Sequence, residues 1–147
     1  MTTAYSFLEV QAAIAGPGGT FNLGNGSGAA EEGITIEMTA EKDIMTIGAD
    51  GTSMHSLSAD NSGMITVRLL KTSPVNAQLQ AMYDAQKLDP SLWAQNVITI
   101  SNTNSGDSVG CRSVAFKKLP NNVYAKEGGM NEWEFNAGAI DTLFGTY

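Results

Sequence analysis

Apolar and polar residues alternate in several short stretches of this chain, and no other feature restricts its fold as strongly. In residues 6–14, every second residue from Leu8 to Ile14 is apolar, and the alternation returns in residues 34–38 and 64–70. Since successive side chains of a strand point to opposite faces, each stretch predicts a strand with one buried face. Further strands are predicted at residues 20–23, 43–48, 97–101, 109–119 and 131–137.

One stretch has the spacing of a helix. Ser73 fits the N-cap position, and Pro74 fits the first helical position, where proline is tolerated best. Apolar residues then recur at helical intervals as far as Lys87, at Val75, Leu79, Met82 and Tyr83. The sequence therefore predicts a mainly β chain with one helix between strands. It contains no internal repeat and no linker, so residues 1–147 are predicted to form a single domain.

The course of the chain at residues 39–42 stays open. The preceding strand either runs straight on, which would place Glu37, Glu41 and Asp43 on one acidic face, or it turns there. Turn-forming residues further on predict a polar connection between two turns, at residues 49–52 and 60–63.

The net charge of −7 is concentrated in the first 60 residues, which carry eight acids and one base, whereas the remainder carries seven of each. Tight binding of nucleic acid needs clustered lysine and arginine that displace counterions, so this balance argues against a nucleic-acid-binding protein. The densest acidic cluster spans residues 31–43. It is either an ordinary solvated strand face or a surface whose function requires negative charge, and composition alone does not separate the two.

No pattern in the sequence predicts a catalytic, metal or cofactor site. The single histidine, His55, and the single cysteine, Cys111, lie far apart, and neither has a partner at the spacing of a zinc site. The segment Gly24–Ala29 matches the letters of a dinucleotide motif, but Glu31, Glu32 and a predicted strand follow it where that motif requires a helix. We therefore expect no enzyme activity and no cofactor.

The chain shows no sign of export. One cysteine cannot form an intramolecular disulfide, which fits folding in a reducing compartment. The N-terminus lacks the pattern of a signal peptide, and no apolar stretch reaches the length needed to span a bilayer. Synthesis in the cytoplasm, without a membrane partner, is the expectation.

Two long stretches resemble the tail tube proteins of contractile-tailed bacteriophages. The first reads IGADG and then NSGMITVRLLKTSPVN, at residues 47–51 and 61–76. The second reads AFKKLP, YAKE and EWEF, at residues 115–120, 124–127 and 132–135. The order and spacing of these segments agree with the family across most of the chain.

This resemblance implies a β-sandwich or partly closed barrel with one flanking α-helix, similar to the tubes of type VI secretion systems and pyocins. It implies that six subunits form a ring, that rings stack into a hollow tube, and that one sheet of each subunit joins a continuous barrel around the lumen. The implied partners are further copies of the chain and the tail sheath, baseplate and tail terminator proteins. DNA or the tape measure protein would pass transiently through the lumen, and the protein would belong to the virion.

Two groups of residues are candidates for roles in such a tube. Acidic lumen walls would repel phosphates within a Debye length of about 8–10 Å, so that DNA slides rather than binds. The lumen-facing candidates are Glu37, Glu41 and Asp43. The candidates for contact between rings are the loop residues Gly24, Asn25, Gly26, Ser27, Gly28, Glu31 and Glu32.

Two other functions stay open. The tube of a tailocin or of a secretion machine would use a similar subunit without conducting DNA. A small β-sandwich module that decorates a virion or binds a defined ligand would stay monomeric or form a small closed oligomer.

Overall fold

The computed structural model describes residues 4–24 and 29–146, with the backbone alone described at residues 29–32. The strands are β1 (Val10–Gly16), β2 (Gly19–Asn22), β3 (Ala29–Met38), β4 (Asp43–Ile47), β5 (Ser53–Leu57), β6 (Gly63–Leu70), β7 (Asn96–Asn102), β8 (Ser108–Lys118) and β9 (Met130–Leu143). The helices are α1 (Val75–Gln86) and two short 3-10 turns, η1 (Phe7–Glu9) and η2 (Pro90–Leu92). The prediction of a mainly β fold with one α-helix is confirmed.

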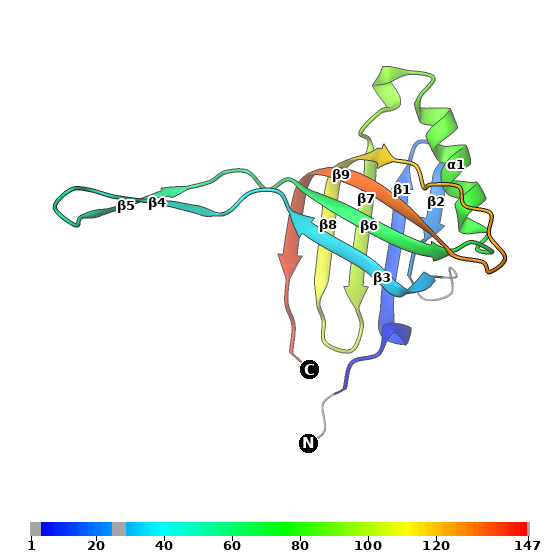
Figure 1. Ribbon diagram of the computed structural model, residues 1–147, viewed down its shortest axis with the longest axis horizontal. Coiled ribbons are helices and arrows are strands. Elements are labelled where there is room, and N and C mark those ends of the chain that lie inside the picture. Colours follow the sequence, from blue (N-terminus) through cyan, green and yellow to red (C-terminus); the bar gives the residue numbers. More distant parts are fainter. Residues whose placement is uncertain (1–3, 25–28, 147) are drawn as a thin grey trace.

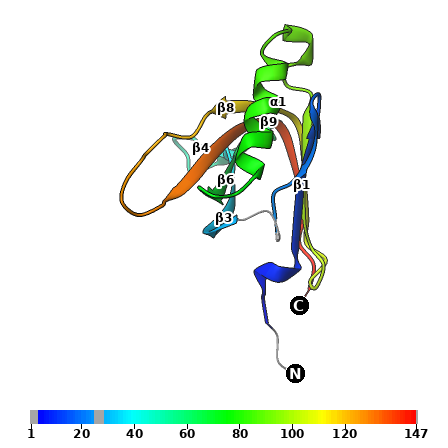
Figure 2. The ribbon, with the colours of Figure 1, turned by 90° about the vertical axis from the view of Figure 1, so that its right-hand side faces the viewer.

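One large antiparallel sheet makes up the body of the molecule. Its seven strands follow the order β2-β1-β7-β8-β9-β6-β3. The long strand β9 pairs with β8 along most of its length and with β6 along its first half. The sheet therefore folds over at β9: β1, β7 and β8 form one layer, and β6 and β3 cross it at an angle in a second layer (Figures 1 and 2). Within the described residues, the edge strands β2 and β3 are not paired with each other, so the two layers do not close into a barrel.

The core lies between these layers, and α1 covers one open side of it (Figure 2). The inward residues of the predicted alternating strands are buried, among them Ile14, Ile65, Val67 and Leu69. Five aromatic side chains form a connected group in which neighbouring ring centroids lie 5.0–6.1 Å apart: Tyr83, Trp93, Phe116, Trp133 and Phe135. This contact between aromatic rings joins α1 to both layers of the sheet.

Side-chain amides hold both ends of α1. At its start, Asn76 donates to the carbonyl of Leu70 at 2.9 Å and accepts from the indole N–H of Trp133 at 2.9 Å. At its end, the buried amides of Gln86 and Asn96 bond each other reciprocally at 2.7 and 3.0 Å. Gln86 also donates to the carbonyl of Pro17 at 2.9 Å, which ties the helix to the β1–β2 turn. These bonds satisfy polar groups that would otherwise be buried without partners.

A long hairpin leaves the body of the molecule between β3 and β6 (Figure 1). We call residues 39–62 the arm; it contains β4 and β5, which pair with each other in a separate two-stranded sheet. At its base, the backbone N–H of Thr39 donates to the carbonyl of Ser62 at 3.0 Å. Lys42 donates to the carbonyl of Asp60 at 2.6 Å and to the amide oxygen of Asn61 at 2.8 Å. The open question at residues 39–42 is thereby answered, because the chain bends there and does not continue β3.

Three predictions of local structure were wrong. Residues 53–57 form β5 rather than a polar connection, because backbone pairing with β4 stabilises them without a buried face. Residues 29–33 belong to β3 rather than to a loop. Strand β9 runs on to Leu143 because its pairing with β8 continues past Gly138 and Asp141, which interrupt the apolar alternation.

Candidate assembly surfaces

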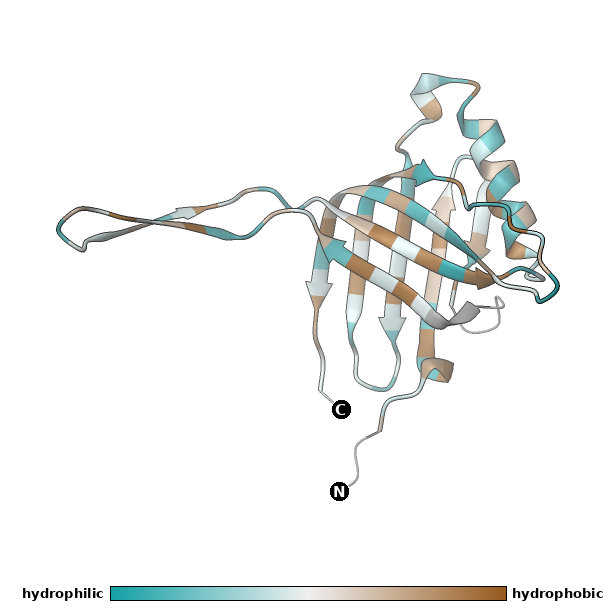
Figure 3. Ribbon diagram, viewed as in Figure 1, coloured by the Kyte–Doolittle hydropathy of each residue, from teal (hydrophilic) through white to brown (hydrophobic). Residues whose placement is uncertain are grey.

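The arm exposes apolar side chains on both of its faces. Side chains alternate between the two faces along each strand, and residues directly opposite each other share a face. Ile44 lies opposite Ser56, and Thr46 lies opposite Met54, so Ile44 and Met54 point to the same face. The other face carries Met45, Ile47 and Leu57. Each of the five apolar side chains is at least 55% exposed, and Figure 3 shows brown segments along the whole arm. A two-stranded hairpin alone is marginally stable in water, so an arm of this composition is typical of a segment that another surface covers.

The arm also carries a net charge of −3, from the four acids Glu41, Asp43, Asp50 and Asp60 and the one base Lys42. Asp43 accepts from His55 across the hairpin at 2.9 Å, and both side chains are about half exposed. At the tip, the backbone N–H of Thr52 donates to Asp50 and lowers the pKa of that carboxyl. At the base, the hydroxyl and backbone N–H of Ser62 lower the pKa of Asp60. The arm therefore stays negatively charged near neutral pH.

The lumen-facing candidates do not lie together. Glu37 is exposed on β3, opposite Met64 of β6, in the body of the molecule. Glu41 and Asp43 are exposed on the arm, beyond the bend that ends β3. The continuous acidic face that a straight strand would have formed is therefore absent from this part of the chain.

The ring-contact candidates lie mostly beyond what the structure describes. Gly24 is buried against β1, where an added Cβ would lie 2.9 Å from the nitrogen of Ala12 and from the carbonyl oxygen of Val10. This close approach of two backbone segments explains a glycine at that position. Asn25, Gly26, Ser27 and Gly28 lie outside the described residues, as do the side chains of Glu31 and Glu32.

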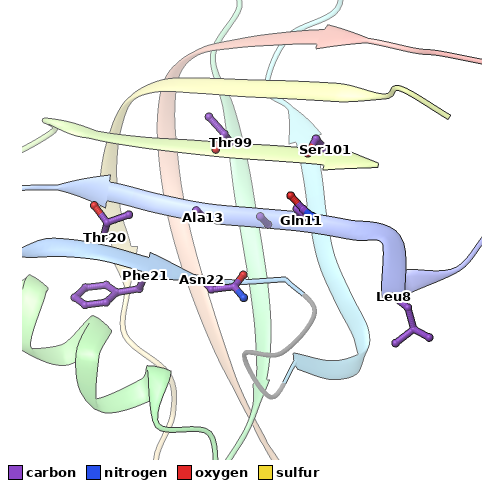
Figure 4. A pocket seen from close by; sticks show the side chains of 9 residues that line it. Leu8, Gln11, Ala13, Thr20, Phe21, Asn22, Thr99 and Ser101 are labelled. Atoms are coloured by element: carbon purple, nitrogen blue, oxygen red, sulfur yellow. The ribbon is translucent and has the colours of Figure 1, made fainter. Parts of the chain in front are cut away.

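The outer face of the β2-β1-β7 layer is hollowed and nearly free of charge. A shallow cavity of about 500 Å³ lies there, lined by small or uncharged side chains that include Gln11, Thr20, Asn22, Thr99 and Ser101. Figure 4 shows these side chains rising from three neighbouring strands. Further along the same sheet, Arg112 and Asp141 form an ion pair at 3.0 Å. The cavity holds no titratable group that could act as an acid, base or nucleophile.

A second groove, of about 250 Å³, is apolar and lies near the two ends of the described chain. The aromatic residues Tyr5, Phe7 and Phe144 line it, together with aliphatic residues of β3, β7 and β8. Asp107 is the one charged residue in the described lining. An uncovered groove of this composition is typical of a contact surface for another protein segment.

The potentially reactive side chains are not organised for catalysis. Cys111 is buried in β8, where burial and then the charge of Asp141 raise the pKa of its thiol to about 11. His55 lies on the arm and bonds Asp43. Across the described residues, no three histidine, cysteine, aspartate or glutamate side chains gather where they could hold a metal ion. The glycine-rich segment is followed by β3 rather than by a helix, so it lacks the geometry of a dinucleotide site.

The sequence patterns did not predict the arm, which is the feature of the described chain with the most exposed apolar side chains close together. Its signal was present: two turn clusters bracket Ser53–Leu57, in which Met54 and Leu57 are apolar although no helix or core strand is predicted there.

No helix in the described part of the chain has the length and apolar content needed to cross a bilayer.

The fold matches solved structures from an extracellular contractile injection system and from the anti-feeding prophage at low sequence identity. One is the sheath/tube terminator of an extracellular contractile injection system, PVC, in the extended state, with a TM-score of 0.59, 13% identity and coverage of 97% of this chain and 98% of that chain. A chain from the anti-feeding prophage baseplate has a TM-score of 0.58, 14% identity and coverage of 97% of both chains. A chain from the anti-feeding prophage cap has a TM-score of 0.53, 14% identity and coverage of 98% and 95%.

At these identities the structures show a shared fold alone. No curated protein matches the sequence significantly. The family model described as bacteriophage PhiTE tail tube protein matches residues 1–145. Because that match spans nearly the whole chain, the protein belongs to the bacteriophage PhiTE tail tube protein family.

Proposed function

We propose that copies of this structural, non-catalytic tail tube protein form hexameric rings, and that the rings stack into a hollow tube through which DNA passes during ejection. The observation that carries the proposal is the combination of an unclosed sheet with an arm that is apolar on both faces. Neither feature suits a permanent monomer. Both are satisfied when further copies of the chain cover them.

The sheet edges support ring formation. Strands β2 and β3 lie at the two ends of the main sheet, and each pairs on one side only within the described residues. Unpaired edges favour association with another strand, and a closed ring removes them. Edge-to-edge pairing around a ring would join the sheets of neighbouring subunits into one barrel around a lumen.

The similar solved structures support the symmetry and the partners. Those structures are of a tube-terminating cap, a sheath/tube terminator, a sheath–tube complex and a baseplate, and the baseplate structure is six-fold symmetrised. By analogy, the proposed partners of this chain are further copies of itself and the sheath, baseplate and terminator proteins of a virion tail. The proposed cargo is DNA, preceded by the tape measure protein.

For the lumen wall we retain Glu37, because it projects from the main sheet. Glu41 and Asp43 lie on the arm, so we assign them to contact between copies instead. An acidic wall repels phosphate within a Debye length of about 8–10 Å and keeps DNA from binding during passage. The segment from Gly24 to Glu32, whose last residues belong to β3, remains a proposed contact between rings.

Sedimentation velocity and negative-stain imaging of the purified protein test this proposal. Both should be run across a wide range of protein and salt concentrations, because mass action drives assembly and salt screens charge. We expect ring-sized species and hollow tubes whose share grows with concentration. A protein that stays monomeric under all these conditions would contradict the proposal.

A conduit for cargo other than DNA is the second candidate. It is favoured by one observation, that similar structures come from an extracellular contractile injection system and from the anti-feeding prophage. The genes next to the coding sequence separate the two functions. Capsid and DNA-packaging genes support a phage tail, whereas a cluster with tube and sheath genes but no capsid genes supports an injection system.

A further inference from the structure

We propose that Met45 and Met54, one on each face of the arm, form an oxidation site, and that conversion of their thioethers to sulfoxides by a peroxide weakens incorporation of the subunit into the tube. The inference rests on the proposed self-assembly and adds a chemical control of it. The oxidation acts on the free subunit, because in the proposed tube other copies cover the arm.

The two arm methionines are the most exposed sulfur-containing residues in the described part of the chain. Met45 is 57% exposed and Met54 59% exposed, whereas Met130 is 43%, Met82 1% and Cys111 0% exposed. Both arm residues lie in a hairpin that projects away from the body, so solvent reaches them from several sides (Figure 1). Since oxidation of sulfur follows exposure, a peroxide meets these two thioethers first.

Two other sulfur atoms are held in less reactive states. Burial raises the pKa of the Cys111 thiol to about 11, so near neutral pH it stays a thiol, and the thiolate is the form that reacts. The sulfur of Met64 accepts a hydrogen bond from the ammonium of Lys117 at 3.1 Å, which occupies a lone pair that would otherwise attack the oxidant. Neither therefore competes strongly with the arm methionines for a peroxide.

The reaction at each methionine is the transfer of one oxygen atom. A lone pair of the thioether sulfur attacks an oxygen of hydrogen peroxide, an S–O bond forms and the O–O bond breaks. The other oxygen takes up the proton of the transferred oxygen and leaves as water, so the sulfur is oxidised and the peroxide is reduced. The product is methionine sulfoxide, which methionine sulfoxide reductases convert back to the thioether. The step requires no catalytic group from the protein.

The positions of the two methionines place a sulfoxide on each face of the arm. Met54 shares one face with Ile44, and Met45 shares the other with Ile47 and Leu57. Any copy that covers either face therefore meets a sulfoxide within an otherwise apolar surface. Burial of that polar oxygen without a hydrogen-bond donor is unfavourable, so oxidation opposes the contact on both faces.

Oxidation of the arm leaves the folded subunit intact. Met45 and Met54 belong to no part of the buried core, and the pairing of β4 with β5 uses backbone groups, which the reaction does not change. Oxidation of the buried Met82 would instead disturb the contact between α1 and the sheet. Assembly and thermal unfolding therefore respond differently to a low dose of peroxide, and the two readouts separate the arm from the core.

Peptide mass spectrometry after treatment of the full-length protein with hydrogen peroxide tests the oxidation site. In free subunits we expect Met45 and Met54 to gain oxygen several times faster than Met64, Met82 and Met130, with thermal unfolding unchanged. In assembled tubes the oxidation of Met45 and Met54 should slow. Equal rates at Met45, Met54 and Met82 in free subunits would overturn the inference, whether or not tubes form.

Pelleting of tubes after the peroxide has been removed with catalase tests the effect on assembly. The subunit concentration left in the supernatant should rise about tenfold, the factor expected when burial of one apolar side chain is lost, and sulfoxides at Met45 and Met54 should be enriched there relative to the pellet. The double substitution Met45→Leu with Met54→Leu conserves volume and should make assembly resistant to peroxide, whereas the control Met130→Leu should stay sensitive.

Two outcomes would overturn the inference: equal sulfoxide content of Met45 and Met54 in pellet and supernatant, or a double variant that loses assembly on treatment as the parent does. The first comparison needs no variant, so it holds even if the double variant assembles poorly. An absence of tubes in the untreated parent protein would instead contradict the proposed function, and the oxidation rates in free subunits would still test the site.

Discussion

Replacing Ile47 by serine separates assembly from folding. The Ile47 side chain is 55% exposed in the single subunit, so its loss removes little of the core. In the proposed tube a neighbouring copy buries it, and full burial of an aliphatic side chain contributes about 1.5–3 kcal/mol. Half of that burial is new on assembly, which gives a loss of about 0.8–1.5 kcal/mol per contact. Since about 1.4 kcal/mol corresponds to a factor of ten, the equilibrium constant for each arm contact should fall about 4- to 13-fold.

The assay is the concentration of subunits that remains in the supernatant after tubes are pelleted. That concentration should rise by about the same factor for Ile47→Ser, because it reports the free energy of adding one subunit. Leu88→Ser is the matched control, because Leu88 is 81% exposed and lies on no proposed contact surface. Thermal unfolding of the single subunits should be the same for both variants. If the supernatant concentration of Ile47→Ser equals that of the control, the arm is not buried in the assembly and the reasoning fails.

Three further outcomes are expected. Gln86→Ala leaves the buried amide of Asn96 and the carbonyl of Pro17 without a partner. Each unsatisfied group costs about 1–3 kcal/mol of stability, so calorimetry should show a melting temperature lower by several degrees. Glu37→Lys should leave tube formation unchanged but slow DNA ejection in an infection assay, and unchanged ejection would remove Glu37 from the lumen wall. Burial raises the pKa of the Cys111 thiol from 9.0 to about 11, so between these pH values the folded state keeps a proton that the unfolded state has lost. The free energy of unfolding, measured in denaturant titrations, should therefore fall as the pH rises from 9 to 11. Cys111→Ala should abolish this contribution to the pH dependence.

The alternating stretches of the sequence predicted the central strands well because these strands have one buried face. Every second side chain of β6, from Ile65 to Leu69, is fully buried, so its apolar pattern follows directly from its environment. The helix could also be predicted, because a proline follows Ser73 and four apolar residues then recur at helical spacing, a pattern that does not fit a strand. Strand β5 could not be predicted in this way, since all five of its residues are exposed and no buried face imposes a pattern.

The candidate site was predicted less well than the fold. A straight strand would have joined Glu37 to Glu41 and Asp43, but whether a strand continues or bends depends on which strand it pairs with next. Pairing of β4 with β5 rather than with β6 moves Glu41 and Asp43 onto the arm.

Cryo-electron microscopy of the assembled protein tests the central claim most directly. The account predicts a hollow tube of stacked six-subunit rings, in which β2 and β3 pair with neighbouring subunits and another copy covers the arm. A map of a small closed oligomer, or of a tube in which the arm projects freely into solvent, would contradict it.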